Sequence, residues 1–137
     1  MTNPDINLLA VLIATILGFG LGALWYSPRL FGKQWIAALN AETEESQADL
    51  SPARTYGTRF VTTLVAAYIL ARVLVLSGTT TLVSGFEMGF LIWLGFVATF
   101  TLDAVLFEKR SFKLYLINGS YYLVNLMLMG AVLGLWH

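Results

Sequence analysis

The chain contains 137 residues, of which 58% are hydrophobic and 12% are charged, and its mean hydropathy is +0.74. This composition excludes an ordinary soluble domain and favours an integral membrane protein. Equal numbers of basic and acidic residues give a formal net charge of zero, so no overall field favours nucleic acid. The absence of cysteine excludes disulfides, thiolate catalysis and cysteine-ligated metal sites.

Four long apolar segments predict four membrane spans, because a helix needs ~20 apolar residues to cross the core of a bilayer. We expect an all-α, polytopic membrane protein, a single domain over residues 1–137 whose four transmembrane helices form an antiparallel bundle. The spans are predicted at about residues 6–26, 56–77, 85–107 and 112–136. The N-terminus lacks the basic region of a secretory signal, so the first segment is interpreted as a retained span.

Local signals mark the ends of these helices. Pro28 disfavours a helical conformation at Ser27 and so ends the first span. Pro52 suits the first helical position of the second helix. The pattern Ser84-x-x-Glu87 is a capping box, which predicts the start of the third helix there. The short connections that follow the second and third helices favour antiparallel neighbours.

The predicted cytoplasmic segment, residues 29–55, has two parts. Its first part has apolar residues at near-helical spacing beside Arg29 and Lys33, which indicates a short interfacial amphipathic helix or a cover packed on the end of the bundle. The apolar positions are Leu30, Phe31, Trp35, Ile36 and Leu39. Its second part, from Asn40 to Leu50, is acidic and is predicted to be a solvated loop, a short helix or a docking patch for a partner.

Basic residues in the connections predict the orientation. They follow spans one and three and are absent from the other side of the membrane. By the positive-inside rule, the connections after spans one and three lie in the cytoplasm, and both termini lie on the non-cytoplasmic side. The basic residues concerned are Arg29, Lys33, Arg54, Arg59, Lys109, Arg110 and Lys113.

Small residues at four-residue spacing predict close helix contacts, because helices in lipid associate through tight packing. The first span carries an unbroken series, Ala10, Ala14, Gly18 and Gly22. The third span repeats the spacing with Gly85 and Gly89, and the fourth with Gly130 and Gly134. The spacing leaves open whether the series on the first span packs within the protein or between copies.

A polar stripe runs along the fourth span. Tyr115, Asn118, Tyr122, Asn125 and Met129 are separated by three or four residues and therefore share one face. Asparagine is costly in hydrocarbon unless it is hydrogen-bonded, so this face is expected to look into the bundle or into a subunit interface. It either joins helices or lines a polar cavity.

Three ionisable residues border or enter the spans. A charged side chain inside a membrane is costly and therefore suggests a functional role. Arg72 is expected to extend towards the outer interface or to pair with Glu87 across the short turn. Asp103 is expected to lie near Asn118 and to pair with Arg59 or with another base on that side, or to handle a proton or ion. We group Asp103, Asn118, Tyr122, Asn125 and Arg59 as a candidate polar cluster, and Arg72 and Glu87 as an outer pair.

The end of the first span carries the motif Gly-x-x-Trp-Tyr-Ser-Pro-x-x-Phe-Gly-x-x-Trp. It consists here of Gly22, Trp25, Tyr26, Ser27, Pro28, Phe31, Gly32 and Trp35. This motif, together with the tail from Gly119 to Gly130, resembles an uncharacterised family of small four-helix bacterial membrane proteins, a domain of unknown function. The resemblance implies the four-span topology and a bacterial inner-membrane location, and no activity, catalytic residue or ligand. The aromatic residues of the motif suit an anchor at the membrane interface.

The sequence contains no recognisable catalytic site. It offers no histidine, cysteine or second carboxylate near Asp103, no metal-ligand spacing and no phosphate-binding loop, so we expect a non-enzyme without cofactor or metal. The first functional hypothesis is a self-associating or accessory helical subunit, whose partners are the lipid bilayer and copies of itself or other membrane proteins, without nucleic acid. The alternative is a small oligomeric channel or transporter with a polar path near Asp103, Asn118 and Asn125.

Overall fold

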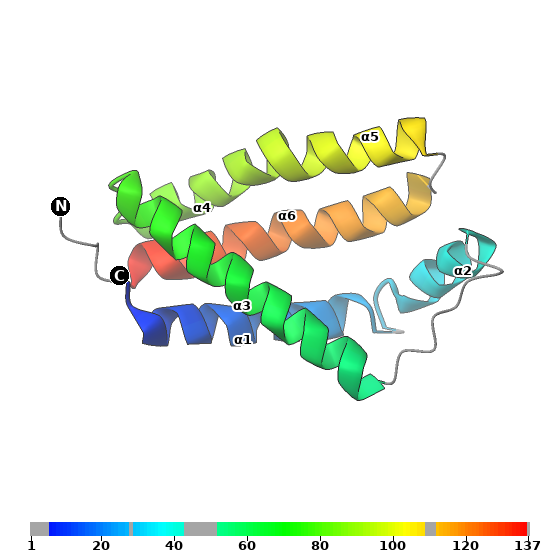
Figure 1. Ribbon diagram of the computed structural model, residues 1–137, viewed down its shortest axis with the longest axis horizontal. Helices are drawn as coiled ribbons and strands as arrows, with labels where there is room; N and C mark the ends of the chain where they lie inside the picture. Colours follow the sequence, from blue (N-terminus) through cyan, green and yellow to red (C-terminus); the bar gives the residue numbers. More distant parts are fainter. Residues whose placement is uncertain (1–5, 28, 43–51, 109–111, 137) are drawn as a thin grey trace.

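The structure is a computed structural model that describes residues 6–27, 29–42, 52–108 and 112–136, all of its regular elements being helical (Figure 1). The helices are α1 (Leu8–Trp25), α2 (Gly32–Glu42), α3 (Pro52–Leu76), α4 (Leu82–Ile92), the π-helical segment η1 (Trp93–Ala98), α5 (Thr99–Phe107) and α6 (Phe112–Leu135). Segments α4, η1 and α5 follow one another as a single rod, the α4–η1–α5 rod. This rod, α1, α3 and α6 are each long and apolar enough to cross a membrane, which confirms the predicted bundle of four spans.

The central helix of the bundle is α6. It contacts α1, α3 and every part of the α4–η1–α5 rod, whereas α3 crosses the bundle diagonally (Figure 1). The start of α1, the end of α3, the start of α4 and the end of α6 lie at one end of the bundle, which we call the terminal end. We call the opposite end, where α2 and the start of α3 lie, the Arg59 end.

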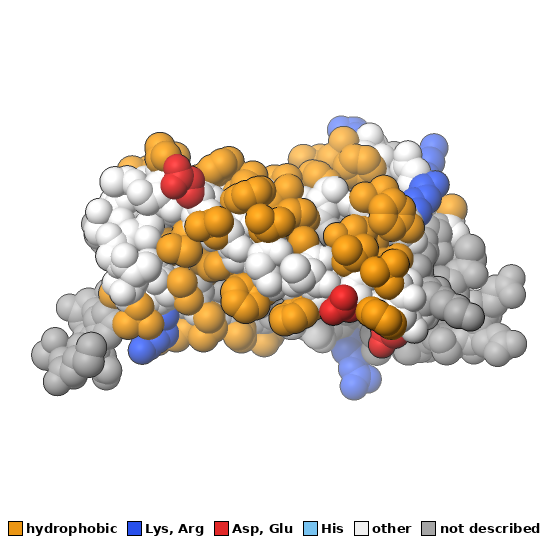
Figure 2. All heavy atoms as spheres, turned by 90° about the horizontal axis from the view of Figure 1, so that it is seen from above, with side chains coloured by type: hydrophobic (Ala, Val, Ile, Leu, Met, Phe, Trp, Pro, Cys, Tyr) orange, Lys and Arg blue, Asp and Glu red, His pale blue; other side chains and the backbone are white. Residues whose placement is uncertain are grey.

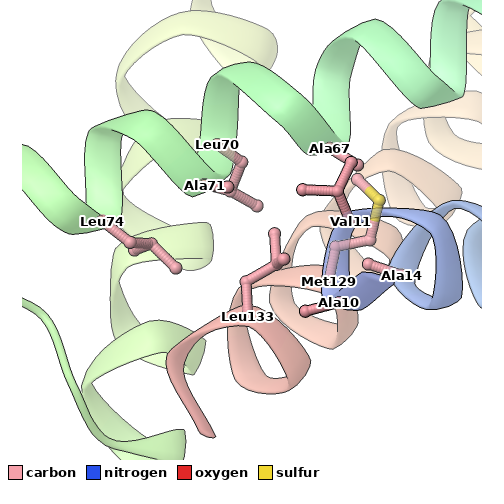
Figure 3. Packing of buried hydrophobic residues seen from close by; sticks show 9 residues of the cluster. All are labelled: Ala10, Val11, Ala14, Ala67, Leu70, Ala71, Leu74, Met129 and Leu133. Carbon is pink, nitrogen blue, oxygen red and sulfur yellow. The ribbon is translucent and has the colours of Figure 1, made fainter. Parts of the chain in front are cut away.

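The small residues of α1 pack inside the protein. Ala10 and Ala14 are fully buried in a cluster formed by α1, α3 and α6 (Figure 3). The described members of this cluster are Ala10, Val11, Ala14, Ala67, Leu70, Ala71, Leu74, Met129 and Leu133. Gly18 and Gly22 continue the buried face towards the Arg59 end. The series therefore serves an intramolecular contact, one of the two alternatives that its spacing left open.

Glycines bring α4 and α6 into backbone contact. A Cβ atom added to Gly85 would overlap the carbonyl of Gly130, and one added to Gly130 would overlap the carbonyl of Gly85. Gly89 meets the backbone of Leu126, and Gly134 meets that of Thr81, in the same way. The predicted contact faces on the third and fourth spans are thus the two sides of one interface.

The third span begins earlier than its capping box predicted. Helix α4 starts at Leu82, and its N-cap is Thr81, whose hydroxyl accepts a hydrogen bond of 3.0 Å from the backbone N–H of Ser84. Glu87 is therefore one turn too far along the helix to complete a capping box, and its side chain is exposed. Arg72 and Glu87, both described, form no ion pair, which leaves the other alternative, that Arg72 extends towards the outer interface.

The segment after α1 contains the predicted short helix as α2. Phe31 and Ile36 are exposed by 37% and 52%, so much of its apolar face is not covered by the bundle, which favours the interfacial alternative over a packed cover. Glu44, Glu45 and Asp49 lie outside the described residues, and the side chain of Glu42 is not described either. Figure 2 views the α4–η1–α5 rod and shows hydrophobic side chains over much of this face, with charged side chains towards its ends.

Candidate functional site

The chain makes a tight turn where α1 ends. The backbone N–H groups of Leu30 and Gly32 donate to the carbonyl of Ser27, at 3.0 and 2.9 Å. This turn places the ring of Phe31 5.0 Å from that of Trp25, and the ring of Trp35 5.0 Å from that of Tyr26, measured between centroids. A Cβ at Gly32 would overlap the carbonyl oxygen of Tyr26, so the tight return depends on glycine at this position.

The aromatic residues of the turn are joined to α6. The indole Nε1 of Trp25 donates to the carbonyl of Ile117 at 3.1 Å, and the hydroxyl of Tyr26 donates to Oδ1 of Asn118 at 2.6 Å. The Asn118 carbonyl oxygen can only accept, so the Tyr26 hydroxyl is the donor. The motif thus fastens the end of α1 to the first half of α6.

Arg59 of α3 lies against two tyrosines. Its guanidinium carbon is 5.0 Å from the ring centroid of Tyr26 and 5.4 Å from that of Tyr121, within the range of cation–π attraction. The Tyr121 hydroxyl donates to the carbonyl of Gly18 at 3.0 Å. A Cβ at Gly22 would lie 2.9 Å from both Nη1 of Arg59 and the hydroxyl of Tyr121, so glycine lets this pair approach α1.

A cleft of about 500 Å³ opens beside this cluster, between α3, η1 and α6. Its lining residues are Thr58, Arg59, Thr62, Thr63, Ala66, Val97, Tyr121, Tyr122, Asn125, Leu126 and Met129. Thr62, Ala66 and Tyr122 are exposed, so the cleft is open sideways, at a depth that lies within the spans. In a membrane this opening faces lipid.

Asn125 occupies the inner part of the cleft without a hydrogen-bond partner for its carbonyl oxygen. The residue is 7% exposed, and Oδ1 is fully buried and has no partner among the described residues. A Cβ at Gly18 would lie 2.5 Å from this oxygen. A buried, unsatisfied amide oxygen is unfavourable by itself, and this one faces Gly18 of α1, which is not part of the cleft lining.

The structure brings together most of the predicted polar cluster. Arg59, Tyr122 and Asn125 line the cleft, and Asn118 is joined to Arg59 through Tyr26. Asp103 is not part of it, because its side chain is exposed on α5, does not line the cleft and pairs with no described base. The expected Asp103–Arg59 pair is therefore wrong. Among the described residues no group of three or more metal-ligating side chains occurs.

Tyr121 is a central residue of the site that the sequence did not indicate. The stripe on the fourth span selected its neighbour Tyr122, whereas Tyr121 points to α1 and supports Arg59. Trp93 was likewise not indicated, and its Nε1 donates to the carbonyl of Gly119 at 2.9 Å. Each role depends on a partner helix, so neither follows from the spacing within one span.

A comparison with protein families identifies a relationship over nearly the whole chain. The model of the family described as "Protein of unknown function (DUF1761)" matches residues 9–134. The chain belongs to the DUF1761 family. No curated protein and no solved structure is significantly similar to it. In this DUF1761 protein, the sequence match extends over all four spans, including the Trp25–Trp35 turn, Arg59 and the cleft.

The Tyr26–Asn118 hydrogen bond gives a first prediction. We expect Tyr26→Phe to lower the free energy of unfolding in mild detergent by about 1–2 kcal/mol, since it leaves the partly buried Asn118 oxygen without this donor. The control is Tyr56→Phe, because Tyr56 is 58% exposed and its hydroxyl makes no described hydrogen bond. Thermal unfolding followed by circular dichroism measures both, and equal melting of the two variants would contradict a structural role for the bond.

Proposed function

We propose that this protein is a self-associating helical module of the bacterial inner membrane, without catalytic chemistry, whose copies pair through the α4–η1–α5 rod. The observation that carries the proposal is the low coverage of this rod. Only 6% of its span window is buried within the protein, against 28% to 44% for the other three spans. One span of four thus contributes almost no side chains to the internal core and is available for contacts with other chains.

The chemistry of the exposed rod favours another helix over lipid alone. Gly95, Thr99 and Asp103 follow one another at four-residue steps, and all three are exposed. A Cβ at Gly95 would meet nothing within 4 Å, so this glycine serves no contact inside the protein. Small and polar residues at this spacing are typical of helix interfaces in membranes, and an intramembrane carboxylate is costly without partners. Gly95 also lies in the π-helical segment, a conformation that is frequent at functional sites.

The orientation proposal uses the basic residues at the Arg59 end. Arg29, Lys33 and Lys113 have exposed side chains there, whereas Arg72 is near the terminal end. The positive-inside rule therefore supports a cytoplasmic location for the Arg59 end and a non-cytoplasmic location for the termini. The alternative function, a solute path, has less support, because Asp103 lies apart from Asn118 and Asn125 and because the cleft opens sideways between helices.

Substitution of Gly95 tests the proposed association. We expect Gly95→Leu to weaken self-association at least tenfold, because the new side chain keeps the partner helix at a distance while meeting nothing inside the protein. Energy transfer between labelled copies in lipid vesicles, followed as the protein-to-lipid ratio changes, measures the effect.

The matched control for Gly95→Leu is Gly20→Leu on α1, since Gly20 is also exposed and has no neighbour within 4 Å of an added Cβ. A protein that is monomeric at every protein-to-lipid ratio would contradict the proposal. Equal association of the two variants would place the interface on another face. Capture of a different membrane protein in fixed stoichiometry would make the chain an accessory subunit.

A further inference from the structure

The cleft beside Arg59 has a charged outer end and an apolar inner end. Arg59 lies three residues inside the start of the span Tyr56–Leu76, about 4.5 Å along the helix axis. Ala66, on the same helix, lies near the middle of the span, and Leu126 and Met129 of α6 line the cleft with it. The change from charged to apolar lining matches a lipid molecule, whose charged headgroup lies near the membrane surface and whose acyl chain points to the membrane centre.

The charge at the outer end is a cation that pairs with none of the described carboxylates. Arg59 forms no ion pair with a described acidic residue. The two tyrosine rings and their hydroxyl oxygens stabilise the cation, yet two neutral oxygens do not satisfy the five N–H donors of a guanidinium as anionic oxygens do. A planar guanidinium at this depth matches the position and the oxygen geometry of a lipid phosphate.

Deeper in the cleft, Asn125 marks a second polar position. It lies one turn of α6 beyond Tyr121, about 6 Å towards the membrane centre. Asn125 is near the middle of the span Phe112–Leu135, beside the apolar lining of the cleft. Its Oδ1 is fully buried beside Gly18 of α1, so the groups that the cleft offers to a ligand are Arg59 and the apolar lining.

We propose that the cleft between α3, η1 and α6 binds one anionic phospholipid of the surrounding bilayer, with its phosphate on Arg59 and an acyl chain along Ala66, Val97 and Leu126. The sideways opening at Ala66 lets the lipid enter from the bilayer without passing through water. The exposed face of the α4–η1–α5 rod, on which association is proposed, is a different surface, so lipid binding does not depend on the proposed function.

Two substitutions separate the charge from the shape of the site. The experiment incubates the full-length protein in mild detergent with phosphatidylglycerol or with phosphatidylcholine of the same chains, and native mass spectrometry counts the retained lipids. The wild-type protein is expected to retain one molecule of phosphatidylglycerol and to retain phosphatidylcholine more weakly. Arg59→Gln should weaken this retention about tenfold or more, by loss of a charge-assisted interaction. Ala66→Trp should weaken it while preserving the charge, because the indole fills the path of the chain.

The controls match each change outside the cleft. Lys113→Gln removes one exposed positive charge at the same end, and Ala23→Trp adds an indole to an exposed position of α1. If Arg59→Gln and Ala66→Trp retain as much phosphatidylglycerol as these controls, the proposal is wrong. Equal retention of both lipids by the wild-type protein would also overturn it. A third arm adds inorganic phosphate alone: if phosphate stabilises the protein against heat and Ala66→Trp has no effect, the ligand is a soluble anion and the assignment to lipid is wrong. The same spectra report the oligomeric state, so failure of the lipid site and failure of association remain distinguishable.

Discussion

Gly130→Ala is expected to lower the free energy of unfolding in mild detergent by about 2–3 kcal/mol, the upper part of the range for overpacked cores. The added methyl group would overlap the carbonyl of Gly85, a backbone atom that cannot move aside as the end of a flexible side chain can. Helices α4 and α6 would have to separate. The contacts at Gly89 and Gly134 belong to the same interface and would be lost with it. Because helices in lipid are held by close packing, nothing compensates for the separation.

The matched control is Gly119→Ala on the same helix, where an added Cβ would meet nothing within 4 Å. Alanine has the higher helix propensity, so this control is expected to be neutral or up to about 1 kcal/mol more stable than the wild-type protein. Unfolding in sodium dodecyl sulfate, followed by far-ultraviolet circular dichroism, measures both variants. Unfolding of Gly130→Ala at the wild-type midpoint would show that α4 and α6 do not meet through their backbones.

The spans could be predicted because a bilayer imposes their length and composition. Pro52 begins α3 as expected for a proline at the first helical position, and the fourth span occurs where the apolar run predicted it. The small residues predicted contact faces for the same reason, since only small side chains allow backbones to approach in lipid. The partners of these faces, α6 for α4 and both α3 and α6 for α1, follow from the three-dimensional arrangement.

The start of α4 shows where local signals were insufficient. Thr81 and Ser84 can both cap a helix, and the residues after each are equally apolar, so Glu87 favoured the wrong one. The π-helical segment at Trp93–Ala98 was not foreseen either, because it leaves the hydropathy of the span unchanged.

The candidate site was predicted only in part, because the sequence indicates the depth of a side chain but not the direction in which it points. Depth along a span can be counted in residues, and this counting placed Arg59 and Asn118 at a similar depth, where Tyr26 joins them in the structure. The direction in which a side chain points around the helix is set by packing. Asp103 has a similar depth but faces outward, whereas Tyr121, one residue from the predicted stripe, faces α1 and Arg59.

Gly32→Ala is expected to destabilise the protein by about 2 kcal/mol and to change its tryptophan fluorescence. The new Cβ would overlap the carbonyl oxygen of Tyr26 and lie 2.8 Å from that of Ser27, two backbone atoms of the sharp turn. Relief requires α2 to move away, which breaks the 2.9 Å hydrogen bond from the Gly32 N–H to Ser27. Trp35 would then leave Tyr26, whose ring lies 5.0 Å away.

The consequence reaches the cleft, because Tyr26 is one of the two rings that hold the Arg59 guanidinium and is also the donor to Asn118. The control is Gly57→Ala, at the same end of the protein, where an added Cβ would have no neighbour within 4 Å. Thermal unfolding and the emission maximum of tryptophan are compared for the two variants. If Gly32→Ala matches Gly57→Ala in both, the turn tolerates a side chain and does not position Arg59. If it differs as expected, the glycine of the motif controls the geometry of the cleft from a distance, by fixing the turn that places Trp35 against Tyr26.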